Sequence, residues 1–271
     1  MSQKYKLVAV DMDGTFLNDQ KDYDRQHFAS LYRQMQAQGV QFVVASGNQF
    51  YQLKTFFADF PEIIYIADNG AYIRNLHTKY FESHFQTDHA QAILDQLLEY
   101  PGLAAELVVS GLKSAYVLET STAQFMEEAH FYNRRLQVVS SFAEINEEIT
   151  KYSFNYETPV ERDFMARLQK QLAQIGELTT SGHGNFDVIQ PGLHKASGLK
   201  FLGRRLGIPL EEMCAFGDGG NDLEMLAAVG DGVAMANGAP EVQRIARHQT
   251  TTNNEQGVLQ YLDQVLANNQ R

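Results

Sequence analysis

The sequence has no tryptophan, one cysteine and six prolines among its 271 residues. One cysteine excludes an intramolecular disulfide, and because Cys214 lies in the apolar run 213–216 we interpret it as a small buried hydrophobic residue. No run of about 18 apolar residues occurs, which argues against a membrane-spanning helix. The first expected strand begins so early that no room is left for a signal peptide. We therefore expect a cytoplasmic protein.

Positive charge is also scarce, because 22 basic residues stand against 33 acidic ones and the net charge is −11. Binding to a phosphate backbone or an anionic lipid surface requires a basic footprint, so we expect no nucleic-acid partner and no membrane contact. Apolar residues are plentiful, at 44% of the chain. At about 150 residues per domain, the length predicts one large or two ordinary domains.

Strands and helices alternate at both ends of the chain. The expected strands are 7–10, 40–45, 63–67, 213–216 and 232–235, and the expected helices are 24–38, a short one through Leu53 and Phe57, 195–206, 221–228 and 256–267. This alternation predicts a parallel sheet with right-handed crossover connections.

The middle of the chain has a different order of elements. Helix 88–99 precedes two short strands, 105–109 and 115–118, and helix 160–175 precedes another two, 178–180 and 186–189. A repeated helix-strand-strand unit is typical of an antiparallel α+β domain. We therefore expect an α/β fold, with a Rossmann-like parallel-sheet core at 1–82 and 188–271 and an inserted α+β domain at 83–187.

The most informative segment is Asp11-Met12-Asp13-Gly14-Thr15, which follows the apolar strand 7–10. Two carboxylates about 4 Å apart repel each other by roughly 4 kcal/mol at an effective dielectric constant near 20. A cation or a catalytic role would compensate for that repulsion. A solvated turn is the ordinary alternative, whereas a calcium-binding EF-hand loop fails because its fifth position would be Thr15.

Three further polar clusters follow the expected parallel strands or open the helix after one. They are Ser46-Gly47, Lys195 and the segment 217–222, which reads Gly217-Asp218-Gly219-Gly220-Asn221-Asp222. Alone, each has an ordinary interpretation: a helix N-cap, a solvated lysine and a tight turn. Because the carboxyl ends of parallel strands meet at one edge, the clusters together predict a ligand site there.

Phosphate-ester chemistry requires residues of these types. A carboxylate can attack phosphorus and form an aspartyl-phosphate. The negative nucleophile and the negative ester approach each other only with a divalent cation, a lysine and backbone N–H donors nearby. Asp11 and Asp218 would supply the oxygen ligands that magnesium prefers. Gly14 and Gly47 would let the backbone approach the phosphate closely.

These four segments, in this order, resemble the motif set of the haloacid dehalogenase superfamily, and the resemblance covers essentially the whole chain. The insertion between the second and third motifs is similar to the Cof-type branch, which carries a large α/β cap domain. The segments around Asp11, Ser46 and 191–196 look especially like bacterial sugar phosphatases of that branch. One departure is Ser46-Gly47-Asn48, where many relatives have Thr-Gly-Arg, and it removes a cation near the entrance.

The resemblance implies a role for each motif residue. Asp11 would be the nucleophile and a magnesium ligand, and Asp13 would be the general acid and then the base, with its backbone carbonyl on magnesium. Asp218 would bind magnesium, and Asp222 would orient the magnesium waters or Lys195. The implied phosphate-binding residues are Met12, Ser46, Gly47, Lys195 and Asn221.

The function implied is a Mg2+-dependent phosphatase that acts on small phosphorylated metabolites, with sugar phosphates as the expected class. An acid at position 13 favours hydrolysis or transfer to a second hydroxyl, so a phosphomutase or phosphotransferase is the enzymatic alternative. A non-catalytic phosphate sensor is the alternative of another class.

Substrate choice would belong to the cap at 83–187 and to loops that face the pocket. The candidate residues are Asp68, Asn69, His183 and Asn185, for which solvated turns are an equally good interpretation. The expected partner is a small-molecule phosphate ester, and the sequence makes no prediction of oligomeric state.

Overall fold

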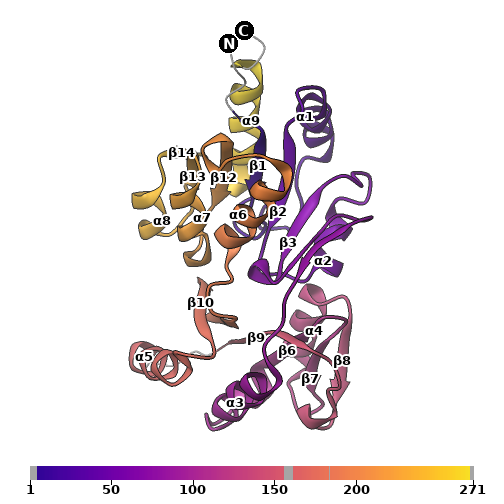
Figure 1. The fold of residues 1–271 in the computed structure, drawn as a ribbon, viewed down its shortest axis with the longest axis vertical. Coiled ribbons are helices and arrows are strands. Elements are labelled where there is room, and N and C mark those ends of the chain that lie inside the picture. Colours follow the sequence, from indigo (N-terminus) through magenta and orange to yellow (C-terminus); the bar gives the residue numbers. More distant parts are fainter. Residues whose placement is uncertain (1–4, 156–160, 183, 269–271) are drawn as a thin grey trace.

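The computed structural model describes residues 5–155, 161–182 and 184–268. An eight-stranded sheet and a six-stranded sheet lie at opposite ends of the molecule, and α1 and α9 lie at the end farthest from the smaller sheet (Figure 1). The larger sheet is built from both ends of the chain, and the smaller one from its middle. Within the described residues, no helix is both long and apolar enough to cross a membrane.

The larger sheet has the strand order β14-β13-β12-β1-β2-β3-β4-β5. It is parallel from β14 to β3, and β4 and β5 extend it as antiparallel strands. The strands are β1 Leu7–Val10, β2 Gln41–Ala45, β3 Ile64–Ala67, β4 Tyr72–Arg74, β5 Lys79–Glu82, β12 Met213–Gly217, β13 Asp231–Met235 and β14 His248–Thr250.

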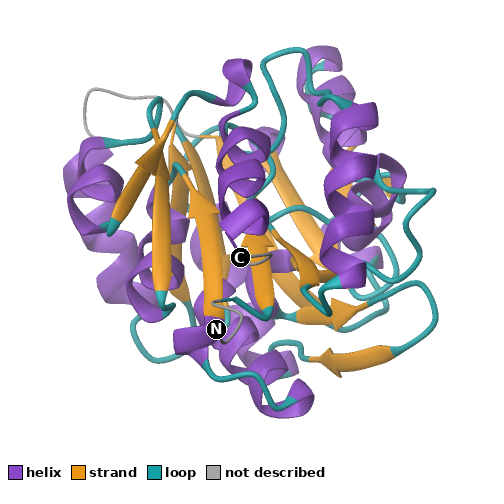
Figure 2. Cartoon of the chain, turned by 90° about the horizontal axis from the view of Figure 1, so that it is seen from above, coloured by secondary structure: helices purple, strands orange, loops and turns teal. Residues whose placement is uncertain are grey.

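Helices cover both faces of this sheet (Figure 2). They are α1 Arg25–Ala37, α2 Phe50–Phe56, α6 Lys195–Leu206, α7 Leu223–Ala228, α8 Pro240–Ile245 and α9 Gly257–Asn268. Side chains alternate between the faces along a strand, so Val8 and Val10 join a cluster with α1 and α9, while Leu7 and Ala9 join one with α6 and α7. Burial on both faces explains why β1 is apolar at every position.

The smaller sheet has the order β10-β11-β9-β6-β7-β8 and is antiparallel except between β7 and β8. We call the unit that it forms with its helices the cap. Its strands are β6 Leu107–Gly111, β7 Ala115–Leu118, β8 Leu136–Val139, β9 Ile149–Asn155, β10 Glu177–Gly182 and β11 Asn185–Ile189, and its helices are α3 Thr87–Leu98, α4 Ala123–Tyr132 and α5 Glu161–Leu172. Apolar side chains of α3 and α5 pack on β9 and β11 to form a separate core.

The predicted fold class is confirmed: a parallel-sheet core carries an inserted α+β unit. Elements that the sequence did not predict are β4, β5, α4, β8, β9, α8 and β14. The middle of the chain is therefore richer than two helix-strand-strand units, because α4, β8 and β9 lie between them. β11 extends to Ile189, two residues beyond the proposed boundary of the insertion.

Candidate active site

The motif residues reach one edge of the large sheet because β1, β2 and β12 are parallel and in register. Val10 ends β1 and pairs with Phe216 of β12, and it also pairs with β2 on its other side. Asp11 leaves the sheet just beyond these pairs, and its backbone N–H still donates to the Phe216 carbonyl oxygen at 3.0 Å. Ser46 and Asp218 follow the ends of the two flanking strands, so all three polar side chains emerge side by side.

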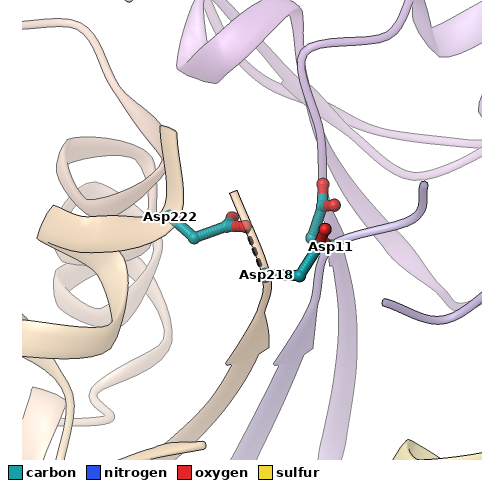
Figure 3. A group of neighbouring side chains, drawn as sticks. All are labelled: Asp11, Asp218 and Asp222. Atoms are coloured by element: carbon teal, nitrogen blue, oxygen red, sulfur yellow. Dashed lines mark hydrogen bonds between the residues drawn. The ribbon is translucent and has the colours of Figure 1, made fainter. Parts of the chain in front are cut away.

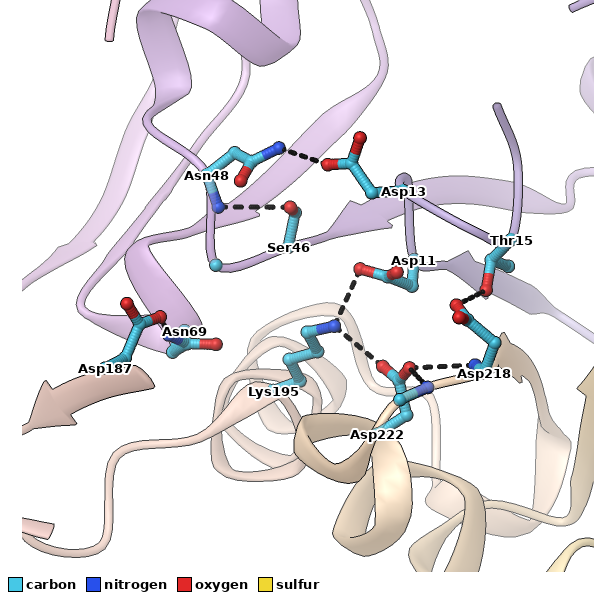
Figure 4. A network of polar contacts seen from close by, with 12 residues as sticks. Asp11, Asp13, Thr15, Ser46, Asn48, Asn69, Asp187, Lys195, Asp218 and Asp222 are labelled. Atoms are coloured by element: carbon cyan, nitrogen blue, oxygen red, sulfur yellow. Dashed lines mark hydrogen bonds and ion pairs between the residues drawn. The ribbon is translucent and has the colours of Figure 1, made fainter. Parts of the chain in front are cut away.

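Lys195, at the first position of α6, lies between two carboxylates (Figure 4). Its Nζ is 2.7 Å from Oδ1 of Asp11 and 2.7 Å from Oδ1 of Asp222. The Lys195 and Asp222 side chains are fully buried. Oδ2 of Asp222 accepts hydrogen bonds from the backbone N–H groups of Asp218 and Gly219, each at 3.0 Å. Both oxygens of Asp222 are thus engaged, whereas Oδ2 of Asp11 accepts no hydrogen bond from the described part of the chain.

Three carboxylates share one buried ammonium here, and the pKa values reflect the imbalance. Burial raises the pKa of Asp11 well above its ordinary value; Lys195 opposes this, and Asp222 and Asp218 add to it. Burial, followed by the charge of Asp222, raises the pKa of Asp218 to about 7. Burial alone would lower the pKa of Lys195, but Asp11 and Asp222 outweigh it and raise that pKa above its usual range. The edge therefore carries excess negative charge.

A divalent cation fits both this charge and the available oxygen atoms. One oxygen from each of Asp11, Asp218 and Asp222 lies within 4.8 Å of the other two (Figure 3). Magnesium takes carboxylate oxygens and keeps several waters. Both oxygens of Asp222 already accept hydrogen bonds, two of them at Oδ2. Asp11 and Asp218 each keep an oxygen that accepts none from the described residues, so these two acids are better placed to hold the ion. The Asp13 side chain is outside this group, and only its backbone carbonyl could serve as the ligand that the resemblance implies.

The loop after β1 is fixed against Asp218. The Thr15 hydroxyl donates to Oδ1 of Asp218 at 2.6 Å, and the Asn237 side-chain amide donates to the Gly14 carbonyl oxygen at 2.7 Å. Gly14 has φ +74°, and a Cβ at this position would lie 2.3 Å from Oδ2 of Asp218. Only glycine fits this combination of backbone conformation and close approach.

The Asp13 carboxylate is held on the other side of the loop, next to the segment that follows β2 (Figure 4). Its Oδ2 accepts a hydrogen bond from Nδ2 of Asn48 at 2.7 Å, and its Oδ1 accepts one from Nζ of Lys21 at 2.7 Å. Burial would lower the pKa of Lys21, but Asp13 outweighs it and raises that pKa. Lys21 therefore supplies a cation beside Asn48, where the sequence alone indicated that one was missing.

The predicted phosphate-binding residues lie around the same space. Ser46 is almost fully buried, and its Oγ accepts the Asn48 backbone N–H at 3.1 Å. Ser46, Gly47 and Asn221 line a common cavity with Asp11. The Met12 side chain packs in the hydrophobic core, which leaves only its backbone amide for a phosphate contact.

This cavity has a volume of about 840 Å³ and is walled by both the core and the cap. Lys151 of β9 reaches from the cap to the core, where its Nζ donates to the Gly47 carbonyl oxygen at 2.7 Å. The same Nζ lies 3.2 Å from Oδ2 of Asp187. That oxygen also accepts a hydrogen bond from Nδ2 of Asn69 at 2.7 Å, and Oδ1 of Asp187 accepts one from Ser153 at 2.6 Å. A buried polar network thus joins the cap to the segment 46–48, which follows β2.

The four residues proposed for substrate selection occupy different places. Asn185 lines the cavity. Asp68 and Asn69 are buried beside the segment 46–48, where their backbone N–H groups donate to the carbonyl oxygens of Asn48 and Ser46, each at 3.1 Å. Burial raises the pKa of Asp68 to about 7; Lys151 opposes this and Asp187 adds to it. His183 lies outside the described residues.

Sequence reasoning missed Lys21, Tyr132, Lys151 and Asp187, which all line the cavity. One of them, Asp187, could have been recognised from the sequence. Asp187 interrupts the apolar stretch of the predicted strand 186–189, a place where burial disfavours a charge. Lys151 lies in β9, which the sequence did not predict, so its position in a strand was not recognisable. Lys21 and Tyr132 gave no such signal, because a lysine in a loop and a tyrosine near a helix end are common.

Comparison with known proteins finds similarity along nearly the whole chain. Residues 8–262 match the family model described as haloacid dehalogenase-like hydrolase. The chain is 40% identical over 266 residues to the 5-amino-6-(5-phospho-D-ribitylamino)uracil phosphatase YbjI of Escherichia coli (strain K12), covering 96% of each. It is 25% identical to the HMP-PP phosphatase of Cronobacter sakazakii (strain ATCC BAA-894), over 88% of this chain and 86% of that relative.

Among solved structures, the crystal structure of SMU.1108c from Streptococcus mutans UA159 is similar with a TM-score of 0.92 and 32% identity. The match covers 97% of this chain and 99% of that protein. The similarity therefore includes the cap as well as the parallel-sheet core.

Proposed function

The chain belongs to the haloacid dehalogenase-like hydrolases and is a phosphoric monoester hydrolase, and we propose that it hydrolyses small phosphorylated metabolites, sugar phosphates in particular, with Mg2+ as cofactor. The observation that carries this proposal is the meeting of Asp11, Asp218 and Lys195 at one sheet edge below a cavity of about 840 Å³. In this proposal the core, 1–82 and 188–271, performs the chemistry, and the insertion 83–187 selects the substrate.

The first step is attack by Oδ2 of Asp11 on phosphorus. That oxygen accepts no hydrogen bond from the described residues, while Lys195 holds the other oxygen and fixes the carboxylate. The bond from phosphorus to the leaving oxygen breaks, Asp13 gives that oxygen a proton, and the phosphoryl group stays on Asp11 as an aspartyl-phosphate. When bound, Mg2+ at Asp11 and Asp218 would offset the negative charge of the nucleophile and the phosphate.

The second step returns the protein to its starting state. A water molecule attacks phosphorus, Asp13 takes one proton from it, and the bond between phosphorus and Asp11 breaks to release inorganic phosphate. Throughout both steps Ser46, Asn221 and the Gly47 amide would hold the phosphate oxygens, because they line the cavity beside Asp11. Lys195, which its ion pair with Asp222 holds in position, would offset the negative charge of the phosphate.

The residues that line the cavity favour a substrate whose leaving group is rich in hydroxyls. On the cap side they present amide, hydroxyl and carboxylate groups, from Asn155, Asn185, Ser153 and Asp187 among others. Such groups exchange hydrogen bonds with sugar hydroxyls and give no purely apolar surface. The cavity is lined by seven acidic residues and two lysines, and this excess of negative charge disfavours a substrate with a second anionic group.

A phosphorylated ribitylamino-pyrimidine is a second candidate substrate, because a relative at 40% identity is named for that activity. Phe125, Tyr132 and Phe154 line the cavity and offer faces on which a planar ring could stack. Its ribityl chain would meet the same polar wall as a sugar.

The test is a panel of phosphate esters assayed for released phosphate with and without Mg2+. The panel holds hexose and pentose phosphates, 5-amino-6-(5-phospho-D-ribitylamino)uracil and 4-nitrophenyl phosphate, and the Asp11→Asn variant is the matched control. Sugar phosphates are expected to be hydrolysed with higher kcat/KM than the ribitylamino compound. The reverse ranking would replace the sugar by the second candidate, and appearance of an isomeric phosphate would indicate a phosphomutase.

A further inference from the structure

Asp13 is held at both of its carboxylate oxygens. Asn48 donates to Oδ2 and Lys21 donates to Oδ1, each at 2.7 Å. A carboxylate oxygen has two acceptor sites, so each oxygen still has one for substrate or water. Two hydrogen bonds of this kind fix the rotation of the carboxyl plane, which a single bond would leave free.

Lys21 reaches Asp13 from a turn that several hydrogen bonds hold in place. The Asn18 side chain accepts hydrogen bonds from the backbone N–H groups of Gln20 and Asp22, each at 3.0 Å, and the Lys21 N–H donates to the Asn18 carbonyl oxygen at 2.9 Å. Lys21 has φ +58°, in the left-handed region of backbone conformation that residues other than glycine rarely adopt. Such conformations persist where surrounding contacts enforce them, often at functional sites.

The other neighbour of the Lys21 ammonium belongs to the cap. Nζ lies 5.6 Å from the centre of the Tyr132 ring, at the last position of α4. A second contact docks the same part of the cap on the core, because the Arg135 guanidinium lies 3.5 Å from the centre of the Tyr51 ring on α2. Lys21 therefore touches Asp13 with its ammonium while the end of α4 closes over it.

We propose that Lys21 is a positioning residue that places Asp13 for proton transfer, and that its contact with Tyr132 makes this placement depend on docking of the cap. This inference rests on the proposed function, in which Asp13 is the acid and base. The leaving oxygen then receives its proton efficiently only when α4 covers the cavity.

The experiment compares two esters that differ in their need for a proton. The alkyl ester is the alkyl phosphate that the wild-type protein hydrolyses fastest in the panel, and the aryl ester is 4-nitrophenyl phosphate, whose leaving group needs little protonation. Lys21→Met is expected to lower kcat for the alkyl ester by about 100-fold, the effect of misplacing a catalytic group by about 1 Å. On the aryl ester the loss should stay below about fivefold, with KM for both nearly unchanged.

Two further single variants and two double variants show whether Lys21 acts through Asp13 and Tyr132. Lys21→Arg should restore most of the alkyl-ester activity, because it keeps the positive charge and the donor. On an Asp13→Asn background Lys21→Met should cause no further loss of activity, because the carboxyl group that Lys21 positions is no longer there. Tyr132→Ala should lower kcat for the alkyl ester selectively by about tenfold, and the loss should not multiply with that of Lys21→Met.

The matched control is Lys79→Met, which removes an exposed ion pair with Glu82 at 2.9 Å on β5, far from this loop in sequence, and should keep wild-type kinetics. Equal losses on the two esters, an effect on KM alone, or multiplicative losses in the double variants would overturn the inference. If Lys21→Met did not fold, Lys21→Arg and Tyr132→Ala would decide, because an unselective Tyr132→Ala loss also overturns it. Failure of the wild-type protein to release phosphate from either ester would refute the proposed function instead.

Discussion

Replacing Asp222 with asparagine should weaken the fold and spare metal binding, although Asp222 belongs to the same acidic group as Asp11 and Asp218. The fully buried Asp222 carboxylate pairs with Lys195 at 2.7 Å and accepts two backbone N–H bonds at 3.0 Å. Asparagine retains one acceptor oxygen for the two amides. It then directs an N–H donor at the Lys195 ammonium and removes the charge that balanced it.

The magnitude follows from what is lost. Breaking a buried ion pair by removing one partner costs about 3–5 kcal/mol. Because Lys195 keeps its contact with Asp11, we expect the lower end, a loss of about 3 kcal/mol in the free energy of unfolding. Asp218→Asn is the matched control. It removes a carboxylate whose pKa is raised to about 7 by burial and by Asp222, so in metal-free buffer it should cause no such loss.

The assay is chemical unfolding of both variants with and without Mg2+. A ligand that binds only the folded state stabilises it by about 2.7 kcal/mol at 100 times its Kd. That increment should persist in Asp222→Asn and vanish in Asp218→Asn. The opposite pattern, an increment lost in Asp222→Asn and kept in Asp218→Asn, would refute the assignment of the two acids.

Four further outcomes are expected. Asp11→Asn should abolish phosphate release without changing the circular dichroism spectrum, and retention of a tenth of the activity would contradict Asp11 as nucleophile. Chelation of Mg2+ should stop turnover and leave the protein folded, and full activity without metal would contradict the mechanism. Deleting 83–187 should lower activity on sugar phosphates far more than on 4-nitrophenyl phosphate, and an unchanged ratio of the two would place specificity in the core. Burial raises the pKa of Asp68 from its ordinary 3.8 to about 7, so the folded state holds a proton there between these pH values and the free energy of unfolding falls as pH rises through that window. Asp68→Asn should remove up to about 4 kcal/mol of that fall and be more stable than wild type at pH 8. An unchanged dependence of stability on pH would contradict this.

The parallel core was readable from sequence because its strands are buried on both faces. The stretches at 7–10 and 213–216 are apolar without interruption, and each runs into acidic or glycine-rich residues at the sheet edge. Because the carboxyl ends of parallel strands meet at one edge of a sheet, the motif residues could be expected together from the sequence. The predicted helix 195–206 has the same bounds in the structure.

The cap was predicted only in outline, for physical reasons. β8 and β9 lie between α4 and α5, and β8 is a short strand with exposed residues and no regular alternation. Its pairing with β7 is parallel and requires the intervening α4, so neither element is recognisable alone. The contacts between cap and core, such as Lys151 with Gly47, join residues about a hundred positions apart, and no local pattern encodes them.

The charge balance of the site explains why its acids are not equivalent. The single positive charge of Lys195 can neutralise only part of the charge of Asp11, Asp218 and Asp222. Its ammonium pairs with Asp11 and Asp222, at 2.7 Å each. Asp218 is left with a neutral partner, the Thr15 hydroxyl. A metal-free site of this kind lowers its energy by taking up protons, as the raised pKa values of Asp11 and Asp218 indicate. A divalent cation would replace those protons, and Asp11 and Asp218, the two acids with raised pKa values, are the residues that would hold it.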